Sequence, residues 1–359
     1  MLIKKIIGYG VCTDEFTFHT LVEALTDEGL LDEAKDVIDI MKQQNVKPDV
    51  FTYSYLMDEC CSQGCLKEAR DLFDSLCKLD YKICANVSGF AKLIRCLCEE
   101  GLVDEAKEVV DIMKQRNWNP NVFVYTSLMD GYCRLGRMDE ARNVFDSLAG
   151  LNVAPNVRSY SVLIKGYCLL GRMKEARDVF DSMVSKSVAH DISCYCILIK
   201  GYCEKMKIDD AMDIFREMPR KGLKPGVSTY NSILKGMFRV GRCSEALEIF
   251  EEMQSIGLEP TFDTHSYMLK GLCMNGQFER ASLFLDELER GEGECLDITY
   301  YNIIIECLCK AKKLDAARAI FRDLATKGLE PDVVTYDIMI EGCFHNGLPE
   351  EAKEILVEM

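Results

Sequence analysis

Apolar residues recur along this chain with the period of an amphipathic α-helix. In the segment 157–191, residues at i, i+3, i+4 and i+7 are apolar and share one helical face: Tyr160, Leu163, Ile164 and Tyr167. A second pattern of the same kind opens with an acidic turn and continues, in the segment 122–156, through Ala141, Val144, Phe145 and Leu148. The two patterns predict paired helices of about a dozen residues each.

A small alanine marks the second helix and recurs along the whole chain at Ala34, Ala69, Ala106, Ala141, Ala176, Ala211, Ala246, Ala281, Ala317 and Ala352. The spacing is 35 residues, except 37 after Ala69 and 36 after Ala281. A fixed period of this length predicts a repeat array, in which the small side chain lets paired helices approach closely. The predicted repeats are 15–49, 50–86, 87–121, 122–156, 157–191, 192–226, 227–261, 262–297 and 298–332, with a truncated tenth at 333–359 and the tail of an earlier repeat at 1–14.

Glycine and proline recur near the expected ends of the helices in the repeats. A glycine such as Gly171 is expected to end the first helix, and a proline near the end of the repeat, such as Pro120 or Pro155, is expected to stop the second. The extra residues of two repeats, around 78–84 and 291–294, are expected in surface turns.

Composition excludes several classes of protein. No apolar run approaches the roughly 18 residues of a membrane span. The 19 cysteines include seven at one equivalent place in seven repeats, which predicts a buried packing slot: Cys61, Cys98, Cys133, Cys168, Cys203, Cys273 and Cys309. Cysteine pairs lack CxxC spacing and the four histidines are scattered, so no metal site is expected, and a reducing compartment fits better than secretion.

The segment 1–14 shows no signal peptide and is too short for a transit peptide. The array is expected either to belong to a longer one or to have partners over its ends. Self-association through incomplete terminal repeats is one such arrangement.

The sequence of the repeats resembles the pentatricopeptide repeat proteins, in the class built only of 35-residue units. Residues 163–176, LIKGYCLLGRMKEA, also look like plant fertility-restorer relatives. Tetratricopeptide repeats run at 34 residues with a Trp and Leu-Gly signature, whereas Trp118 here is expected in a loop. The resemblance implies an all-α, right-handed α-solenoid superhelix that binds single-stranded RNA at one base per repeat. It also implies a role in the processing, stability or translation of organellar transcripts, mitochondrial more often than chloroplast, with any cleavage done by a recruited nuclease.

In the family, two side chains per repeat read the base: a first reader after the first-helix aromatic, and a second reader at the end of the repeat. Carried over to this sequence, adenine is favoured by Thr126 with Asn156 and by Ser54 with Asn86; guanine by Ser161 with Asp191 and by Ser266 with Asp297; uracil by Asn302 with Asp332; and a pyrimidine by Asn231 with Thr261. No base is assigned to His19 with Asp49, Ala91 with Asn121, Cys196 with Gly226, or Asp337. The implied target is 5′-nAnAGnYGU-3′.

The family also sandwiches each base with an apolar residue two places before the aromatic. Phe16, Phe51, Phe123 and Val334 fit that pattern, whereas Ser193, Ser228 and Asp263 depart from it.

A net charge of −16 is awkward for a nucleic-acid ligand, but basic residues recur in register. Four residues after the first reader, and so on the same helical face, stand Arg95, Lys165, Lys200, Lys235 and Lys270. Arg134, Arg239 and Lys310 lie one turn further along. We interpret this basic stripe as phosphate-facing and expect repeats 157–297 to dominate affinity, because acids take the stripe position elsewhere: Glu23, Asp58, Asp130, Glu306 and Glu341.

No known catalytic motif occurs, and neither an enzyme activity nor a cofactor is expected. The competing hypothesis is a protein-binding scaffold whose acidic surface docks a basic partner.

Overall fold

The computed structural model describes residues 15–78, 88–290 and 296–359, and within these ranges the ordered elements are helices. The predicted tail at 1–14, the predicted reader Asn86 and most of the extra residues near 78–84 and 291–294 lie outside the described residues. The chain divides into two compact parts, an N-terminal part of residues 1–190 and a C-terminal part of residues 191–359.

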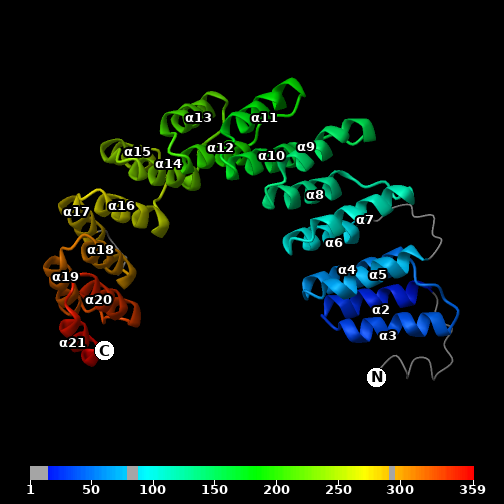
Figure 1. Ribbon diagram of the computed structural model, residues 1–359, viewed down its shortest axis with the longest axis horizontal. Coiled ribbons are helices and arrows are strands. Elements are labelled where there is room, and N and C mark those ends of the chain that lie inside the picture. Colours follow the sequence, from blue (N-terminus) through cyan, green and yellow to red (C-terminus); the bar gives the residue numbers. More distant parts are fainter. Residues whose placement is uncertain (1–14, 79–87, 291–295) are drawn as a thin grey trace. The chain divides into compact units, whose positions relative to one another are not determined.

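The N-terminal part consists of helix pairs (Figure 1). Its helices are α2 (Glu15–Asp27), α3 (Leu31–Gln43), α4 (Val50–Ser62), α5 (Leu66–Cys77), α6 (Ser88–Glu99), α7 (Val103–Gln115), α8 (Val122–Arg134), α9 (Met138–Ser147), the 3₁₀ turn η1 (Ala149–Leu151), α10 (Val157–Leu169) and α11 (Met173–Ser185).

The C-terminal part continues the same alternation. Its helices are α12 (Ile192–Glu204), α13 (Ile208–Arg220), α14 (Val227–Arg239), α15 (Cys243–Ser255), α16 (Phe262–Met274), α17 (Phe278–Arg290), α18 (Ile298–Lys310), α19 (Leu314–Thr326), α20 (Val333–His345) and α21 (Pro349–Glu358).

Each part is a stack of these pairs. The first helix of a pair packs against its own second helix and against the first helix of the next pair, so that α2, α4, α6, α8 and α10 form one layer, and α12, α14, α16, α18 and α20 form another. The second helices cover these layers. The predicted all-α helical repeat solenoid is confirmed.

The recurring alanine is the tightest position of each helix pair. All ten alanines are at most 2% exposed, which confirms their predicted role in close helix packing. The first-helix aromatics pack beside them and reach the second helix, as where the Tyr230 hydroxyl donates to Glu252 at 3.0 Å. Trp118 lies in a loop as expected but is buried, with its ring stacked on Phe90 at a centroid distance of 5.4 Å.

Glycines end the first helices as predicted. Gly136 and its equivalents hold positive φ, 73° at Gly136, a conformation that side chains with a Cβ rarely adopt. The predicted role of the prolines is wrong. Helix α7 already ends at Gln115, Asn117 takes the left-handed conformation (φ 58°), and Pro120 comes three residues later. The proline instead directly precedes Asn121, the N-cap of α8.

The cysteine slot is confirmed as a packing position. Its seven cysteines are at most 8% exposed. Burial raises the pKa of the Cys98, Cys133 and Cys203 thiols to about 12, which keeps them protonated and inert at neutral pH.

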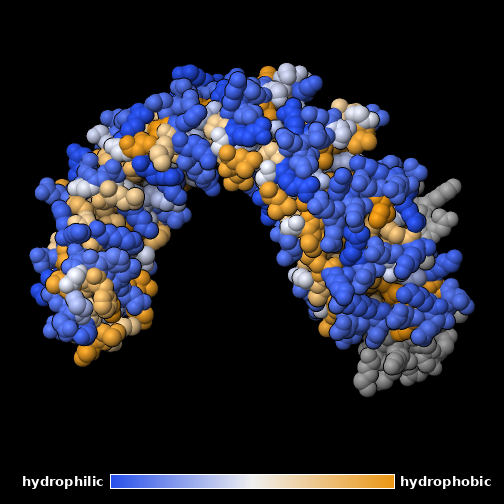
Figure 2. Space-filling view, viewed as in Figure 1, coloured by the Kyte–Doolittle hydropathy of each residue, from blue (hydrophilic) through white to orange (hydrophobic). Residues whose placement is uncertain are grey.

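The face of the molecule in Figure 2 is largely hydrophilic, with separate hydrophobic patches. Among the described residues, each helix is too short or too polar to cross a lipid bilayer.

Candidate nucleic-acid interface

The predicted second readers that the structure describes are N-cap residues. Each of these directly precedes a first helix, so the last residue of one repeat is also the N-cap of the next. The side chains of Asp49, Asn121, Asn156, Asp191, Thr261, Asp297 and Asp332 accept from backbone N–H groups in the first turn of that helix, whereas Gly226 has no side chain to do so. Capping satisfies donors that have no partner within the helix. It also fixes the position of each side chain.

Capping determines which polar atom of the second reader is left over. Asn156 Oδ1 accepts from Ser159 N at 3.0 Å, and only an oxygen can accept this bond, so the amide Nδ2 is the group that remains to donate. In Asp332, Oδ1 accepts from Thr335 N at 2.8 Å, which leaves Oδ2 as an acceptor. Asparagine and aspartate at this place therefore present opposite hydrogen-bonding characters.

The predicted first readers lie between consecutive first helices and are more buried than a solvent-facing position would be. Ser54, Thr126, Ser161, Ser266 and Asn302 are 5–8% exposed, whereas His19, Ala91, Cys196 and Asn231 are half-buried and Asp337 is exposed. In the described part of the chain, buried polar atoms without a hydrogen-bond partner include Ser54 Oγ, Asn231 Oδ1, Ser266 Oγ and Asn302 Oδ1. Such atoms cost stability until a ligand supplies a partner.

Hydrogen bonds link the two readers of several repeats. Asn302 Nδ2 donates to Asp332 Oδ1 at 3.3 Å. Thr126 Oγ1 lies 3.1 Å from Ser159 Oγ, which in turn lies 3.2 Å from Asn156 Oδ1. The structure therefore brings these two pairs together.

A recurring buried Ser or Thr, represented by Ser159 in the second of these links, was missed from sequence. It stands two residues before the first reader and three after the N-cap, at Thr52, Ser159, Thr229, Thr264 and Thr335. Its signal is the recurring spacing of an N-cap residue followed three residues later by a second hydrogen-bonding side chain, as in Thr261 and Thr264, which form a capping box.

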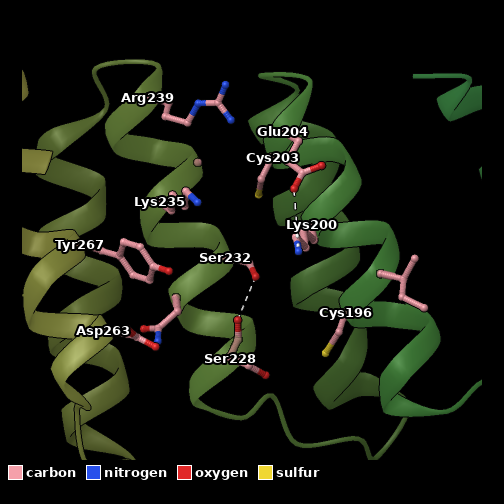
Figure 3. A pocket seen from close by; sticks show the side chains of 13 residues that line it. Cys196, Lys200, Cys203, Glu204, Ser228, Ser232, Lys235, Arg239, Asp263 and Tyr267 are labelled. Carbon is pink, nitrogen blue, oxygen red and sulfur yellow. Dashed lines mark hydrogen bonds and ion pairs between the residues drawn. The ribbon is translucent and has the colours of Figure 1, made fainter. Parts of the chain in front are cut away.

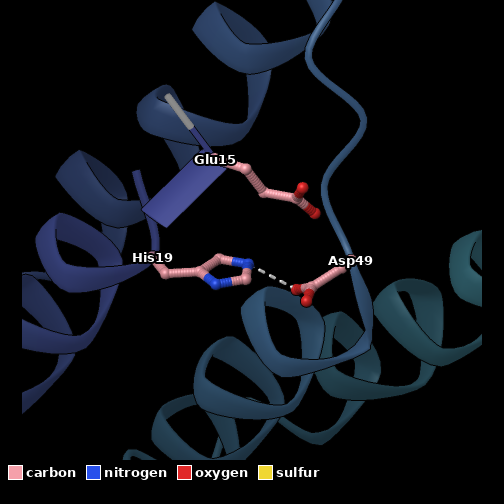
Figure 4. A group of neighbouring side chains, drawn as sticks. All are labelled: Glu15, His19 and Asp49. Atoms are coloured by element: carbon pink, nitrogen blue, oxygen red, sulfur yellow. Dashed lines mark ion pairs between the residues drawn. The ribbon is translucent and has the colours of Figure 1, made fainter. Parts of the chain in front are cut away.

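The pair His19 and Asp49 makes an ion pair, with Nε2 of His19 2.6 Å from Oδ1 of Asp49 (Figure 4). Glu15 lies beside them, and one potential metal-ligand atom from each residue falls within 4.8 Å of the others. Glu15 is exposed and the other two are half-buried, and the ion pair alone accounts for their approach. That the chain has no resident metal stays a prediction.

All eight predicted phosphate-facing residues are exposed, but several have acidic neighbours. Arg134 lies 2.9 Å from Asp130, which also lies 3.7 Å from Lys165. Lys310 pairs with Glu306, and Lys200 Nζ is 4.0 Å from Glu204. The acids at the stripe position thus neutralise part of the predicted stripe.

The least neutralised cations line an open groove of about 380 Å³ across α12, α14 and α16. Lys200, Lys235 and Arg239 lie along it together with the predicted readers Cys196 and Asn231 (Figure 3). Lys235 Nζ sits 5.5 Å from the ring centroid of Tyr267 on the groove wall. Among the described residues, Lys235, Arg239 and Lys270 make no ion pair.

The predicted sandwich residues are exposed hydrophobic side chains. Phe16 is 76% exposed, Phe123 63% and Val334 54%, although apolar side chains of this size are ordinarily buried. In the groove over α12, α14 and α16, the sandwich positions are occupied by the polar residues Ser228 and Asp263. Tyr267 is the only aromatic side chain among the residues that line this groove.

Hydrogen bonding keeps the capping carboxylates ionised. Bonds from Thr335 hold the pKa of Asp332 below its usual value, and bonds from Thr299 do the same for Asp297. Both side chains are therefore acceptors at neutral pH. Asp58 at the stripe position differs, because burial raises its pKa.

Comparison with known sequences identifies the family. The profile of the PPR repeat family matches residues 13–62, 85–134, 120–169, 163–204, 190–239, 225–274 and 296–345, and that of the single PPR repeat matches 51–81, 263–291 and 334–359. The chain belongs to the PPR repeat family. The predicted resemblance is confirmed at this level.

Two PPR relatives come from Arabidopsis thaliana. A mitochondrial pentatricopeptide repeat-containing protein is 30% identical over 83 residues, which are 23% of this chain and 20% of the relative. A chloroplastic one is 38% identical over 61 residues, 16% of this chain and 9% of the relative. The matched segments span a fifth or less of these relatives.

Two solved structures are also similar. Maize PPR10 is 19% identical with a TM-score of 0.48, covering 97% of this chain and 58% of PPR10. Yeast Rmd9p in complex with a 16-nt target RNA is 11% identical with a TM-score of 0.47, covering 89% of this chain and 76% of Rmd9p.

Proposed function

We propose that this PPR protein binds single-stranded RNA along its first helices, one base per repeat. The observation that carries the proposal is the pairing of two polar positions at several first-helix starts, where capping leaves a defined donor or acceptor on the second reader. Unpartnered buried atoms of the first readers add further hydrogen-bonding capacity, which a χ1 rotation of Ser54 or Ser266 would turn toward a base.

The capping geometry supports a physical basis for base preference. Adenine N1 and cytosine N3 are acceptors, whereas guanine N1 and uracil N3 carry hydrogen. The free Nδ2 of Asn156 complements the first two bases, and the free Oδ2 of Asp332 complements the second two. These characters agree with adenine for Thr126 with Asn156 and uracil for Asn302 with Asp332.

The groove over α12, α14 and α16 supports a path for the RNA backbone, because its free ammonium and guanidinium groups lie beside reader positions. Exposed Phe16 and Phe123 would stack on bases at the N-terminal repeats. We propose nine reading repeats, 15–49 through 298–332, and the target 5′-nAnAGnYGU-3′.

We further propose that the protein acts on organellar transcripts, in mitochondria ahead of chloroplasts. The first relative is described as mitochondrial and the next as chloroplastic, which supports this assignment. Cleavage or protection of the bound RNA would then depend on partner enzymes such as a nuclease.

The test exchanges one atom of one repeat. Fluorescence anisotropy would compare RNA containing 5′-nAnAGnYGU-3′ with a scrambled RNA, the DNA version, and an RNA with guanine in place of the second adenine. The wild-type protein should prefer the designed RNA, and Asn156→Asp should shift preference at that base toward guanine by about tenfold, as expected for one hydrogen bond. Aspartate also caps a helix, so the fold is retained.

Asp332→Asn is the matched control, because it should change preference at the last base and leave the second adenine unaffected. Equal binding to all four nucleic acids, or none at physiological salt, would contradict base reading and favour the protein-binding scaffold.

A further inference from the structure

The cysteine slot faces one particular position of the next repeat, which is usually glycine. At Gly131, an added Cβ would lie 2.4 Å from Cys98 Sγ, and at Gly166 it would lie 2.6 Å from Cys133 Sγ. The same contact recurs at Gly236 against Cys203 (2.9 Å) and at Gly342 against Cys309 (2.4 Å). Successive first helices therefore meet where a sulfur of one lies against the bare backbone of the next.

At two junctions the glycine is replaced by a second cysteine. Cys96 takes the position of Gly131 and faces Cys61, and Cys307 takes the position of Gly342 and faces Cys273. The thiols of Cys61 and Cys96 lie close enough to affect each other's pKa, as do those of Cys273 and Cys307. The first pair joins α4 to α6 and the second joins α16 to α18.

The equivalent glycine junctions show how closely the first helices meet at this position. At the glycine junctions, an added Cβ would lie 2.6 Å from the Cβ of Cys98 and 2.8 Å from that of Cys309. A disulfide needs about 3.5–4.5 Å between its Cβ atoms, so a junction opened by about an ångström suits it. The two cysteine junctions also contain extra residues. Cys61 and Cys96 are 35 positions apart and Cys273 and Cys307 are 34 apart, whereas the two positions of each glycine junction are 33 apart.

The two thiols of each pair differ in exposure. Cys96 and Cys307 are half-exposed and can meet a small oxidant, whereas Cys61 and Cys273 are buried. The neighbouring Cys273 thiol lowers the pKa of Cys307, against the opposing effects of burial and of Glu306. Cys307 is thus the nucleophile of its pair and Cys273 the resolving thiol.

We propose that Cys273 with Cys307, and Cys61 with Cys96, are dithiol modification sites that hydroperoxides convert into disulfides between adjacent repeats. The Cys307 thiolate attacks one oxygen of hydrogen peroxide, the O–O bond breaks, and sulfenic acid forms with release of hydroxide. The Cys273 sulfur then displaces the sulfenic oxygen, which leaves as water after taking up the thiol proton. Two thiols lose two electrons in total, and one peroxide becomes two waters. This site stands whether or not the chain binds RNA.

Mass spectrometry of the whole folded chain tests the proposal. After brief exposure to hydrogen peroxide, alkylation and digestion without reductant, the Cys273–Cys307 and Cys61–Cys96 peptides should be cross-linked and lighter by two hydrogens. Cys98 and Cys133 are matched controls, because their slots face Gly131 and Gly166; they should be oxidised at least about tenfold less. Cross-links that involve these controls equally, or no cross-links while other thiols are oxidised, would overturn the proposal.

A second variant keeps the test independent of disulfide yield. Cys273→Ser removes the resolving thiol, so Cys307 should stop at sulfenic acid and be captured by dimedone, whereas Cys309→Ser should leave the Cys273–Cys307 cross-link unchanged. If Cys307 in Cys273→Ser gives no dimedone adduct, or if it reaches a disulfide with another cysteine just as readily, the assigned pairing is wrong.

Discussion

At the scale of single residues, one side chain at each repeat boundary serves two functions. Asn156 caps α10 through Oδ1 and keeps Nδ2 available for a ligand. Asp332 divides its two oxygens in the same way at α20. An exchange between Asn and Asp can therefore change the ligand preference with little loss of helix stability. A residue without a side-chain acceptor cannot cap the helix. Gly226 shows the limit of this arrangement, because it precedes α14 without a side-chain cap.

Substitutions at Asn156 should separate the two functions. Asn156→Ala removes the acceptor for Ser159 N and should destabilise the start of α10 by about 1 kcal/mol, whereas Asn156→Asp should change it by much less. Hydrogen exchange of α10 amides measures this locally, with roughly fivefold faster exchange expected for the alanine variant. Equal protection in all three proteins would mean that the cap contributes nothing to stability.

At the scale of elements, the distance between neighbouring first helices depends on small residues. Gly166 of α10 receives Cys133 of α8, and an added Cβ would also lie 2.6 Å from Met138 Sδ. Cβ atoms do not approach other atoms this closely, so any larger residue must push the helices apart.

Gly166→Ala should therefore destabilise the α8–α10 contact by about 1–2 kcal/mol, since overpacking outweighs the gain in helix propensity. Gly150→Ala is the matched control, because nothing lies within 4 Å of its added Cβ. Exchange protection in α8 and α10 reports the effect, and adding Cys133→Ala should restore part of it. If Gly166→Ala leaves the exchange protection of α8 and α10 unchanged, the interface has space for the added methyl group.

Sequence periodicity was enough to predict the helices and the glycines between them, because each depends on residues within one repeat. The role of Pro120 was mistaken, because helix α7 already ends at Gln115, shortly before the left-handed Asn117. The predicted reader positions lie at helix starts, and their contact with bases stays a prediction; the capping partner Ser159 and the facing of Cys307 on Cys273 were missed. The contact of Ser159 with Thr126 and that of Cys307 with Cys273 join consecutive repeats, so only the stacking of helices reveals them.

At the scale of the whole molecule, the negative charge is arranged so that a patch of unpaired basic residues remains among the described residues. The net charge is −16, yet acids of second helices such as Asp104 and Asp209 pair with arginines of the next repeat, Arg137 at 2.9 Å and Arg242 at 2.6 Å. Such exposed pairs contribute little stability each. They do reduce the negative charge on the surface formed by the second helices. Among the described residues, Lys235, Arg239 and Lys270 make no ion pair and keep their positive charge.

The salt dependence of RNA binding should follow from these pairings. Each phosphate neutralised on a single strand contributes about −0.7 to the slope of log affinity against log salt. Removing an unpaired cation with Lys235→Gln should therefore make the slope shallower by about 0.7. Lys310→Gln is the control, because that ammonium is already paired with Glu306 and should change the slope much less. Anisotropy titrations from low to physiological salt measure both variants.

If the two substitutions reduce the slope equally, exposure alone governs phosphate contact and the ion pairs of the stripe have no role. If neither substitution changes the slope, the RNA follows a different path.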